Sequence, residues 1–272
     1  MYVLSTMRIR ARLIMSFLLC VVLMAAIGVF GYVGTGQIQK QVRTLNEIRI
    51  PALDYLMETD RDLQQLLVAE RSMIYSTAGS EQFQVLVDAY EENLGQAAER
   101  WEKYKVLAAT EVELLTIPQY EAARSEWEPL SRAIVDGRIA DTREGRRLAI
   151  DLSLGQAAQS FDAMREHLNT LQEINLGLSA STQAESESVY AQTVVVLLSI
   201  VGGGLLIAIA LAFLITASIT SPLKVVSATA AEISKGNFTM EAVQVKGRDE
   251  LARLAGEFNT MNDSLRQDRK ST

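Results

Sequence analysis

Two long apolar stretches without charged residues, one near each end, constrain this 272-residue chain more than any other feature. Residues 13–33 and 193–218 contain no Lys, Arg, Asp or Glu. Each supplies the roughly 20 apolar residues that a helix needs to cross the hydrocarbon core of a bilayer. We therefore predict membrane-spanning helices over 13–33 and 193–216, with residues 34–192 on one side of the membrane and both tails on the other.

The charges next to these stretches predict the orientation. Arg8, Arg10 and Arg12 precede the first stretch, and Lys224 and Lys235 follow the second. Segments rich in Lys and Arg stay on the cytoplasmic side. Residues 34–192 hold 15 Lys+Arg against 26 Asp+Glu, a net charge of −11, whereas the rest of the chain carries +4. We predict a multi-pass protein of the inner, cytoplasmic membrane with both termini, including residues 1–12, in the cytoplasm.

The first stretch also has features of a cleaved signal peptide, because basic residues precede it and Ala25-Ala26 lies within it. Its apolar run is longer than the roughly 7–15 residues of a usual signal core. Phe30 and Tyr32 near its outer end, and Tyr190 before the second stretch, suit the aromatic belt at a membrane surface. These observations favour a span. Cys20 is the only cysteine, so the domain over 34–192 must fold without an internal disulfide.

Helical periodicity covers most of residues 34–192. Apolar residues at alternating spacings of four and three predict one helix along the first part and a second along residues 83–108. Arg49, Thr59 and Glu70 interrupt the first apolar stripe. Ser80 is the predicted N-cap of the second helix, and Gly79 suits a left-handed turn before it.

Two further helices complete the predicted bundle. The third contains Pro118 in its first turn, is kinked at Pro129 and ends near Asp136-Gly137. The fourth begins near Asp141 or Ser153 and runs without Pro or Gly from residue 178 to the second span. We predict an all-α chain whose outer domain is an antiparallel four-helix bundle.

After the second span, two short apolar series keep the spacing of coiled-coil seams. They consist of Ile219, Leu223, Val226, Ala230 and Ile233, and of Leu251, Leu254, Phe258, Met261 and Leu265. Helices of about four turns are marginal alone in water, so each needs partners. The connector between them, with Gly236 as helix stop and Val243 and Val245 as apolar anchors, lets the helices lie parallel. A dimer of this unit makes a parallel four-helix bundle.

Residues 219–265 resemble a HAMP domain, the linker module of bacterial chemoreceptors and sensor kinases. The resemblance rests on Pro222, on Gly236-Asn237-Phe238, on Arg248-Asp249-Glu250-Leu251 and on Phe258-Asn259-x-Met261. It implies that Glu250 caps or staples the start of the second helix and that Pro222 couples the span to the first. Ala252 stands where many members of the family have Gly. The implied signalling residues are Pro222, Gly236, Phe238, Val243, Val245, Asp249, Glu250, Phe258 and Met261, in a domain over 217–268 that is followed by a tail over 269–272.

The whole chain resembles the N-terminal half of a methyl-accepting chemotaxis protein with a four-helix-bundle sensor, and Arg49-Ile-Pro51-Ala-Leu53 is typical of the first sensor helix. The resemblance implies a homodimeric receptor that binds a small molecule or a periplasmic binding protein. It also implies downstream kinase-coupling proteins if an output domain is attached. Arginines hold carboxylate ligands in this family, so Arg61 and Arg71 are the candidate ligand residues. Salt bridges with Glu58, Asp62 or Glu70 are the alternative role for these arginines.

No catalytic motif is present in the sequence. It contains no Walker loop, dinucleotide fingerprint, nucleophile elbow or Cys/His cluster, so we expect no enzyme activity, cofactor, metal or nucleic-acid partner. The single histidine, His167, is interpreted as a surface residue. Gly202-Gly203-Gly204 is interpreted as a helix-packing site, and the Arg138 to Arg147 region as a solvated loop.

Two other readings of the chain are open. The chain could be the input half of a sensor histidine kinase or of a HAMP-linked cyclase. It could also be a membrane-anchored coiled coil without signalling, although the HAMP-like connector argues against that reading.

Overall fold

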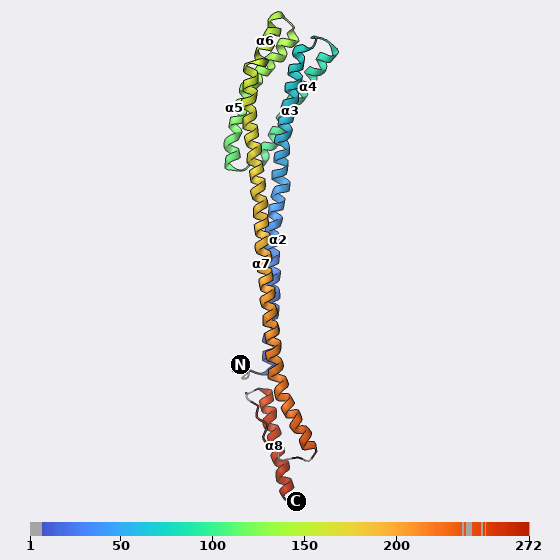
Figure 1. The fold of residues 1–272 in the computed structure, drawn as a ribbon, viewed down its shortest axis with the longest axis vertical. Helices are drawn as coiled ribbons and strands as arrows, with labels where there is room; N and C mark the ends of the chain where they lie inside the picture. Colours follow the sequence, from blue (N-terminus) through green and yellow to red (C-terminus); the bar gives the residue numbers. More distant parts are fainter. Residues whose placement is uncertain (1–6, 236, 238–240, 246, 248, 272) are drawn as a thin grey trace. The chain divides into compact units, whose positions relative to one another are not determined.

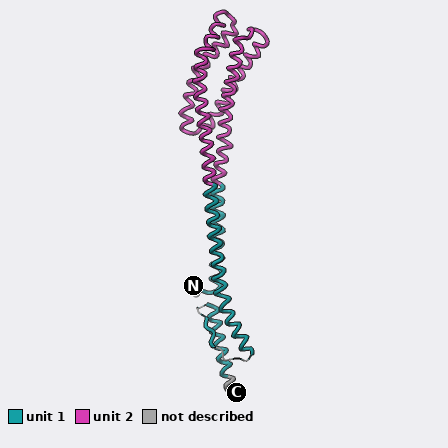
Figure 2. The backbone as a smooth tube through the Cα atoms, viewed as in Figure 1, with its two compact units in different colours: residues 1–35, 190–272 teal, residues 36–189 magenta. Residues whose placement is uncertain are grey.

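A computed structural model of the chain describes residues 7–235, 237, 241–245, 247 and 249–271, with side chains up to residue 267. The regular elements of these residues are all helices (Figure 1), so the all-α prediction is confirmed. The chain divides into two compact units, one made of Met1–Thr35 with Tyr190–Thr272 and the other of Gly36–Val189 (Figure 2).

The unit Gly36–Val189 is a bundle of antiparallel helices. The helix α2 (Ile9–Thr44) ends in it, and α7 (Gln156–Ser234) begins in it. Between them lie η1 (Leu45–Arg49), α3 (Ile50–Tyr75), α4 (Glu81–Leu107), α5 (Glu111–Ala140) and α6 (Arg143–Leu154). In Figure 1, α4 folds back along α3 and α5 returns toward α6. The four-helix arrangement follows if α6 and the first part of α7 are counted as one broken fourth helix.

The predicted apolar stripes pack against one another and form the core of this bundle. Its largest fully buried side chains are Leu56, Leu63, Leu66 and Met73 of α3, Tyr90 and Tyr104 of α4, Tyr120 and Trp127 of α5, and Phe161, Met164 and Leu168 of α7. The ring of Trp127 lies 5.4 Å from that of Phe161, which joins α5 to α7. Burying each large apolar side chain is worth about 1.5–3 kcal/mol, so this cluster holds the four helices together.

The start of α4 confirms the predicted cap. The backbone N–H of Phe83 donates a hydrogen bond of 3.1 Å to Ser80 Oγ. Gly79 has a φ of 75°, a left-handed conformation that glycine adopts without steric cost.

The corner between α5 and α6 differs from the prediction. The helix α5 begins at Glu111, so Pro118 lies inside it and not in its first turn, and it continues through Pro129 to Ala140. The left-handed residue that ends it is Asp141. Gly137 is needed for a different reason, because a Cβ there would lie 2.7 Å from the carbonyl oxygen of Gly145. The two glycines let the adjacent helices α5 and α6 approach closely, a contact that the sequence pattern did not reveal.

The fourth helix of the bundle starts twice. The helix α6 begins just after Asp141, and α7 begins just after Ser153, so each of the two predicted starts corresponds to a real helix. Gly155 separates them, and a Cβ there would lie 2.7 Å from the carbonyl oxygen of Asp151. From Gln156 onward α7 is one helix to Ser234, with Pro222 inside it.

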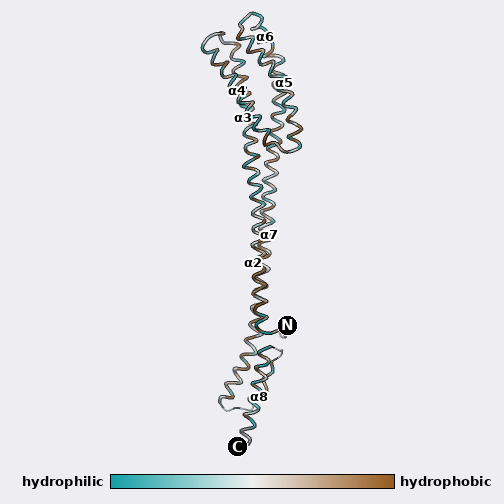
Figure 3. The backbone as a smooth tube through the Cα atoms, turned by 180° about the vertical axis from the view of Figure 1, so that it is seen from behind, coloured by the Kyte–Doolittle hydropathy of each residue, from teal (hydrophilic) through white to brown (hydrophobic). Residues whose placement is uncertain are grey.

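The unit Met1–Thr35 with Tyr190–Thr272 contains the two apolar stretches, which are the brown parts of α2 and α7 in Figure 3. Each includes an 18-residue window of mean hydropathy 2.8, none of which is buried inside the protein. By length and composition, both helices are able to cross a membrane. They touch at Gly34, where a Cβ would lie 2.4 Å from the side chain of Thr193, and at Gly204, where it would lie 3.4 Å from Leu23 Cδ1.

The C-terminal part of this unit pairs the end of α7 with α8 (Glu250–Ser271). Val226 of α7, Val243 of the connector and Ala255 of α8 form a small buried cluster, and Val245 and Phe258 pack against it. Four residues of the predicted seams remain exposed in the single chain, namely Leu223, Leu254, Met261 and Leu265. The small cluster leaves these four side chains uncovered in one chain.

Candidate functional site

The polar residues that interrupt the first apolar stripe, which runs along η1 and α3, are buried in the bundle. Thr59 is fully buried, Glu70 is 1% exposed and Arg49 is 9% exposed. Burying such groups without partners costs free energy. Arg49 and Glu70 contact polar groups of other helices, and these contacts define two buried clusters.

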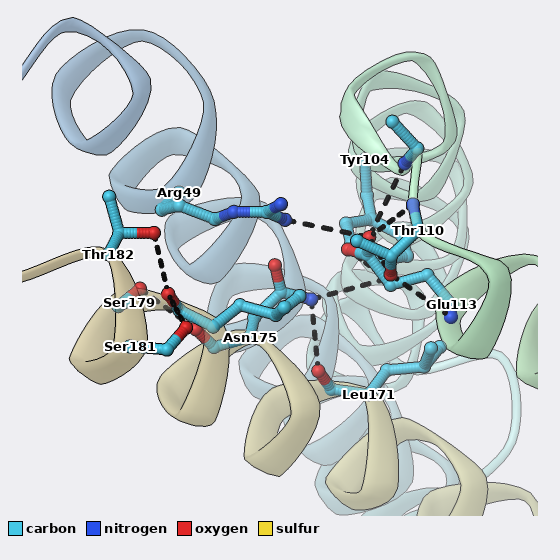
Figure 4. Close-up of polar contacts among 11 residues, drawn as sticks. Arg49, Tyr104, Thr110, Glu113, Leu171, Asn175, Ser179, Ser181 and Thr182 are labelled. Carbon is cyan, nitrogen blue, oxygen red and sulfur yellow. Dashed lines mark hydrogen bonds and ion pairs between the residues drawn. The ribbon is translucent and has the colours of Figure 1, made fainter. Parts of the chain in front are cut away.

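The first cluster surrounds Glu113 at the start of α5 (Figure 4). Glu113 Oε2 accepts hydrogen bonds from the backbone N–H of Thr110 at 3.1 Å, from Thr110 Oγ1 at 2.6 Å and from the N–H of Ala109 at 3.3 Å. The Thr110 hydroxyl accepts in turn from the N–H of Glu113, which completes a capping box. Arg49 Nη1 lies 3.5 Å from the same carboxylate oxygen. The α4–α5 loop is thus attached to the helix that leads into α3.

Asn175 links the same cluster to α7. Its Nδ2 donates to the carbonyl of Leu171 at 3.0 Å and to the Tyr104 hydroxyl at 3.3 Å, and that hydroxyl lies 3.4 Å from Glu113 Oε1. Burial raises the pKa of the Glu113 carboxyl, but its hydrogen bonds from Thr110, Asn175 and Ala109 lower that pKa more, so the net shift is downward. We call Arg49, Tyr104, Glu113 and Asn175 the loop cluster. It ties one hairpin tip to the two helices that continue into the apolar stretches.

The backbone at Arg49 has an unusual turn. Residues 45–49 form η1, a π-helical turn in which the N–H of Ile50 bonds to the carbonyl of Leu45. Pro51 follows, lacks an N–H and would clash with a carbonyl four residues earlier in a regular helix. The wider turn relieves that clash and directs Arg49 into the bundle. The sequence pattern pointed to Arg49 and Pro51 but did not predict the π-helical turn.

The second cluster is a chain of three groups from three helices. Ser131 Oγ of α5 donates a short hydrogen bond to Glu70 Oε2 of α3, and it lies 3.0 Å from the Tyr90 hydroxyl of α4. The guanidinium of Arg132 lies 5.2 Å from the centre of the Tyr90 ring. Burial raises the pKa of Glu70 to about 7, against smaller lowering effects of Ser131 and Arg71. Glu70 therefore changes charge near neutral pH inside the core.

The candidate ligand arginines lie on the outer face of α3. Arg61 pairs with Asp62 at 3.2 Å and with Glu58 at 3.4 Å, as the salt-bridge alternative anticipated. Arg100 of α4 joins the same two carboxylates. Arg71 is exposed. The structure does not bring Arg61 and Arg71 to a common site within one chain, so their ligand role stays a prediction.

Arg138 is not part of a solvated loop, contrary to the prediction. It is 3% exposed. Its Nε donates to the carbonyl of Met73 at 2.9 Å and its Nη2 to that of Ser76 at 2.8 Å. Both carbonyls lie at the end of α3, where a helix lacks its regular partners, and the Met73 carbonyl also accepts from the N–H of Ser76. Arg138 therefore caps α3 from α5.

An open groove of about 440 Å³ lies between α4 and α5. Its lining includes Trp101, Arg124, Glu128, Pro129 and Arg132. Arg124 pairs with Glu128 at 3.3 Å, and Arg132 pairs with Glu91. These internal ion pairs leave the groove without a strong excess of either charge.

The predicted HAMP residues occupy definite places where the structure describes them. Val243, Val245 and Phe258 belong to or pack on the small cluster described above, Pro222 lies inside α7, and Met261 is exposed. Gly236 and Phe238 lie outside the described residues. Asn259 belongs to the quoted motif but not to the implied signalling residues. Its Oδ1 accepts from the N–H of Val243 at 2.8 Å, and its Nδ2 donates to the carbonyl of Val243 at 3.0 Å.

Two acidic residues act at the start of α8, where the resemblance implied that Glu250 caps or staples the helix. Asp249 is the cap, because its Oδ1 accepts from the N–H of Ala252 at 3.0 Å. Glu250 instead accepts at 2.9 Å from the N–H of Ile9, at the start of α2. The local pattern could not reveal a partner 241 residues away.

Comparison with known proteins agrees with this anatomy. Residues 6–190 match the family described as a four helix bundle sensory module for signal transduction. The chain belongs to this family. Residues 214–267 match the HAMP domain, so the predicted HAMP module is confirmed. A protein of Acetivibrio thermocellus named as a sensory transducer is 26% identical over 167 residues, which are 61% of this chain and 25% of that relative.

The two family matches divide the chain into a sensory module and a HAMP domain. The sensory module and the HAMP domain are signalling modules rather than catalytic ones, and together they make a signal-transducing sensory receptor. The order of modules is that of the N-terminal half of a methyl-accepting chemotaxis protein, as the resemblance predicted. The aligned part spans about a quarter of the relative's length.

We predict that Glu70→Gln makes the bundle's stability less dependent on pH. A carboxyl whose folded pKa lies above its unfolded value stabilises the fold below the unfolded pKa, and this contribution is lost as the pH rises through the folded pKa. A rise from 4.5 to about 7 corresponds to about 3 kcal/mol. Between pH 5 and 8, the variant should therefore gain up to about 3 kcal/mol relative to the parent chain.

Urea unfolding followed by tryptophan fluorescence measures this. Trp101 and Trp127 are the only tryptophans and both are buried in the bundle, so the signal reports this unit alone. Glu173→Gln, at an exposed position of α7, is the control and should differ from the parent chain equally at both pH values. A stability difference between Glu70→Gln and the parent chain that is the same at pH 5 and pH 8 would refute the prediction.

Proposed function

We propose that this chain is the input half of a bacterial chemotaxis receptor in the cytoplasmic membrane. In this proposal, residues 1–12 are a cytoplasmic tail, 13–33 and 193–216 cross the membrane, and 34–192 sense an extracytoplasmic stimulus. Residues 217–268 form the HAMP domain and 269–272 a tail. The observation that carries the proposal is that α7 (Gln156–Ser234) is one helix containing a bundle helix, an apolar stretch and the first HAMP helix. Displacement of such a helix by 1–2 Å is a known mode of switching.

Three observations support passage through the membrane. The apolar windows of α2 and α7 are uncovered by the rest of the protein, at a hydropathy that suits lipid. Arginines precede the first stretch and lysines follow the second, as expected of cytoplasmic flanks. Within one compact unit, Arg12 before the first stretch pairs with Asp249 after the second, which requires both to lie on the same side.

Cysteine labelling of intact cells tests this topology. In a Cys20→Ser background, Glu92→Cys in the exposed face of α4 should react with a membrane-impermeant maleimide in intact cells. Arg253→Cys in the exposed face of α8 should react only after the cells are permeabilised. Labelling of Arg253→Cys in intact cells, or labelling of both only after permeabilisation, would refute the proposed topology.

The proposed receptor is a homodimer, and α3 offers an interface for a second copy. Along its outer face, Ile50, Met57, Val68 and Tyr75 are 58%, 62%, 65% and 89% exposed. With Asp54, Arg61, Gln64 and Arg71 they form an outer seam at alternating spacings of four and three. This is the spacing of a coiled-coil seam, which a parallel copy of the same helix complements. The exposed seam residues of the HAMP part support the same association, since Leu223, Leu254, Met261 and Leu265 are uncovered in one chain.

We predict that Val68→Glu weakens this dimer. In the dimer, the introduced carboxylates of the two copies would face each other across the two-fold seam and would lose their hydration. The dissociation constant of the dimer should therefore rise by about ten-fold or more. Val85→Glu is the matched control, because Val85 of α4 is also apolar and 60% exposed but lies off the outer seam. Dilution-dependent energy transfer between labelled chains in nanodiscs or micelles measures the constant. Equal effects of the two substitutions would count against the outer seam as the interface.

A dimer through the outer seam would bring Arg61 and Arg71 of one copy close to the same residues of the other. Arginines of two copies would face each other across the seam, and a carboxylate ligand would offset their repulsion. We therefore propose these residues as the ligand contacts for a small carboxylate, with a periplasmic binding protein as the other kind of partner. Coupling of the receptor to a kinase through coupling proteins requires an output domain. The relative is long enough to contain one, since the aligned part is 25% of its length. The sensor-kinase and cyclase readings are not favoured by the relative's name, which is that of a sensory transducer.

A further inference from the structure

The start of α2 is attached to the start of α8 by two polar contacts. Both lie in the unit Met1–Thr35 with Tyr190–Thr272. The side chains of Arg12 and Asp249 form an ion pair and are only 1% and 5% exposed. The backbone N–H of Ile9 donates a hydrogen bond of 2.9 Å to Glu250 Oε2. The first N–H groups of a helix have no helical partner, so Glu250 satisfies α2 from outside.

Asp249 divides its carboxylate between two helices. One oxygen accepts from the N–H of Ala252 and so caps α8, and the other pairs with Arg12 of α2. A change in the position of α2 therefore acts on the group that starts α8. Because both side chains are buried, water does not replace either partner when the pair opens, and a buried charge left alone is costly.

The chain segment that joins α7 to α8 is a connector whose described residues are not helical. The helix α7 ends at Ser234 and α8 begins at Glu250, and no regular element lies in the described residues between them. A non-helical connector transmits an axial displacement poorly, so what fixes α8 is its packing on Val226 and Val243 and its contacts with α2. The first turns of α8 are thus held both by α7, through the cluster at Val226, and by α2, through the two polar contacts.

We propose that α2 is a second input to the HAMP module, delivered through the Arg12–Asp249 pair and the Ile9–Glu250 hydrogen bond. The HAMP module then reads the displacement of α7 relative to α2 rather than the position of α7 alone. Arg12 and Asp249 are positioning residues in this scheme. The inference rests on the proposed receptor function, since it assigns both helices to the membrane.

Hydrogen exchange of the full chain in nanodiscs tests the inference. The variants are Arg12→Gln, which removes the charge, and Asp249→Asn, which removes the charge but keeps an oxygen for the cap. Arg10→Gln is the matched control, because Arg10 is exposed, two residues away and equally important for the positive flank. Arg12→Lys restores the charge without the guanidinium.

The expected result has a local and a distant part. In Arg12→Gln and in Asp249→Asn, the amides of residues 250–255 should exchange about ten-fold faster, the size expected for one charged hydrogen bond in a local opening. The double variant should match the single ones instead of multiplying their effects. Residues 259–267 at the other end of α8 should also exchange faster by about two-fold or more if the contact sets the packing of the whole helix. Arg10→Gln should leave both segments unchanged, and Arg12→Lys should lie nearer the parent chain.

Three outcomes would overturn the inference. They are unchanged exchange at residues 250–255, equal effects of the Arg12 and Arg10 variants, and a change confined to residues 250–255, which would make the pair a helix cap rather than an input. The maleimide labelling of the same chains separates this failure from failure of the proposed topology. Labelling as proposed with unchanged exchange refutes only the second input, whereas labelling contrary to the proposal refutes the membrane assignment of both helices.

Discussion

The hydrogen-bonded backbone of α7 is the constraint on which the rest of this protein depends. From Gln156 to Ser234 the helix has no interruption, although it comprises a helix of the bundle, an apolar stretch and the first helix of the HAMP domain. Three glycines at 202–204 weaken it in water, whereas in the proposed membrane location lipid would offer their backbone groups no competing partners. Pro222 is the one residue that removes a donor, and it lies after the apolar stretch, where the helix continues for another twelve residues. A break anywhere earlier would separate the sensory bundle from the HAMP module.

The buried polar groups determine how the bundle is tied to that helix. An apolar core of Leu, Trp and Tyr side chains would hold four helices together with little regard for their axial register. The loop cluster adds direction, because Glu113 caps α5, meets Arg49 of η1 and, through Tyr104, meets Asn175 of α7. Within the described part of the chain, Arg49 Nε and Asn175 Oδ1 have no hydrogen-bond partner. The cluster is therefore only partly satisfied, and a partly satisfied buried polar network costs free energy.

Much of this anatomy could be read from the sequence because it is encoded locally. Apolar spacings of four and three predicted the helices, and Ser80 predicted the start of α4. Val243 and Val245 were recognised as apolar anchors from their place in the connector, and both contribute to the small HAMP cluster. The misses share another cause. The contact of Gly137 with Gly145, the cap that Arg138 places on α3 and the Arg12–Asp249 pair all depend on partners brought together by the fold. Residue types alone do not identify such partners.

The most direct test of the account measures backbone hydrogen exchange of residues 180–192, which lie between the bundle core and the second apolar stretch. If α7 is unbroken, these amides donate to carbonyls four residues earlier and should exchange at least about a hundred-fold more slowly than the non-helical connector at 241–245, in the full chain in nanodiscs. Exchange as fast as that of the connector would mean a hinge in this segment. It would contradict the claim that one helix carries the signal from the sensory bundle to the HAMP domain.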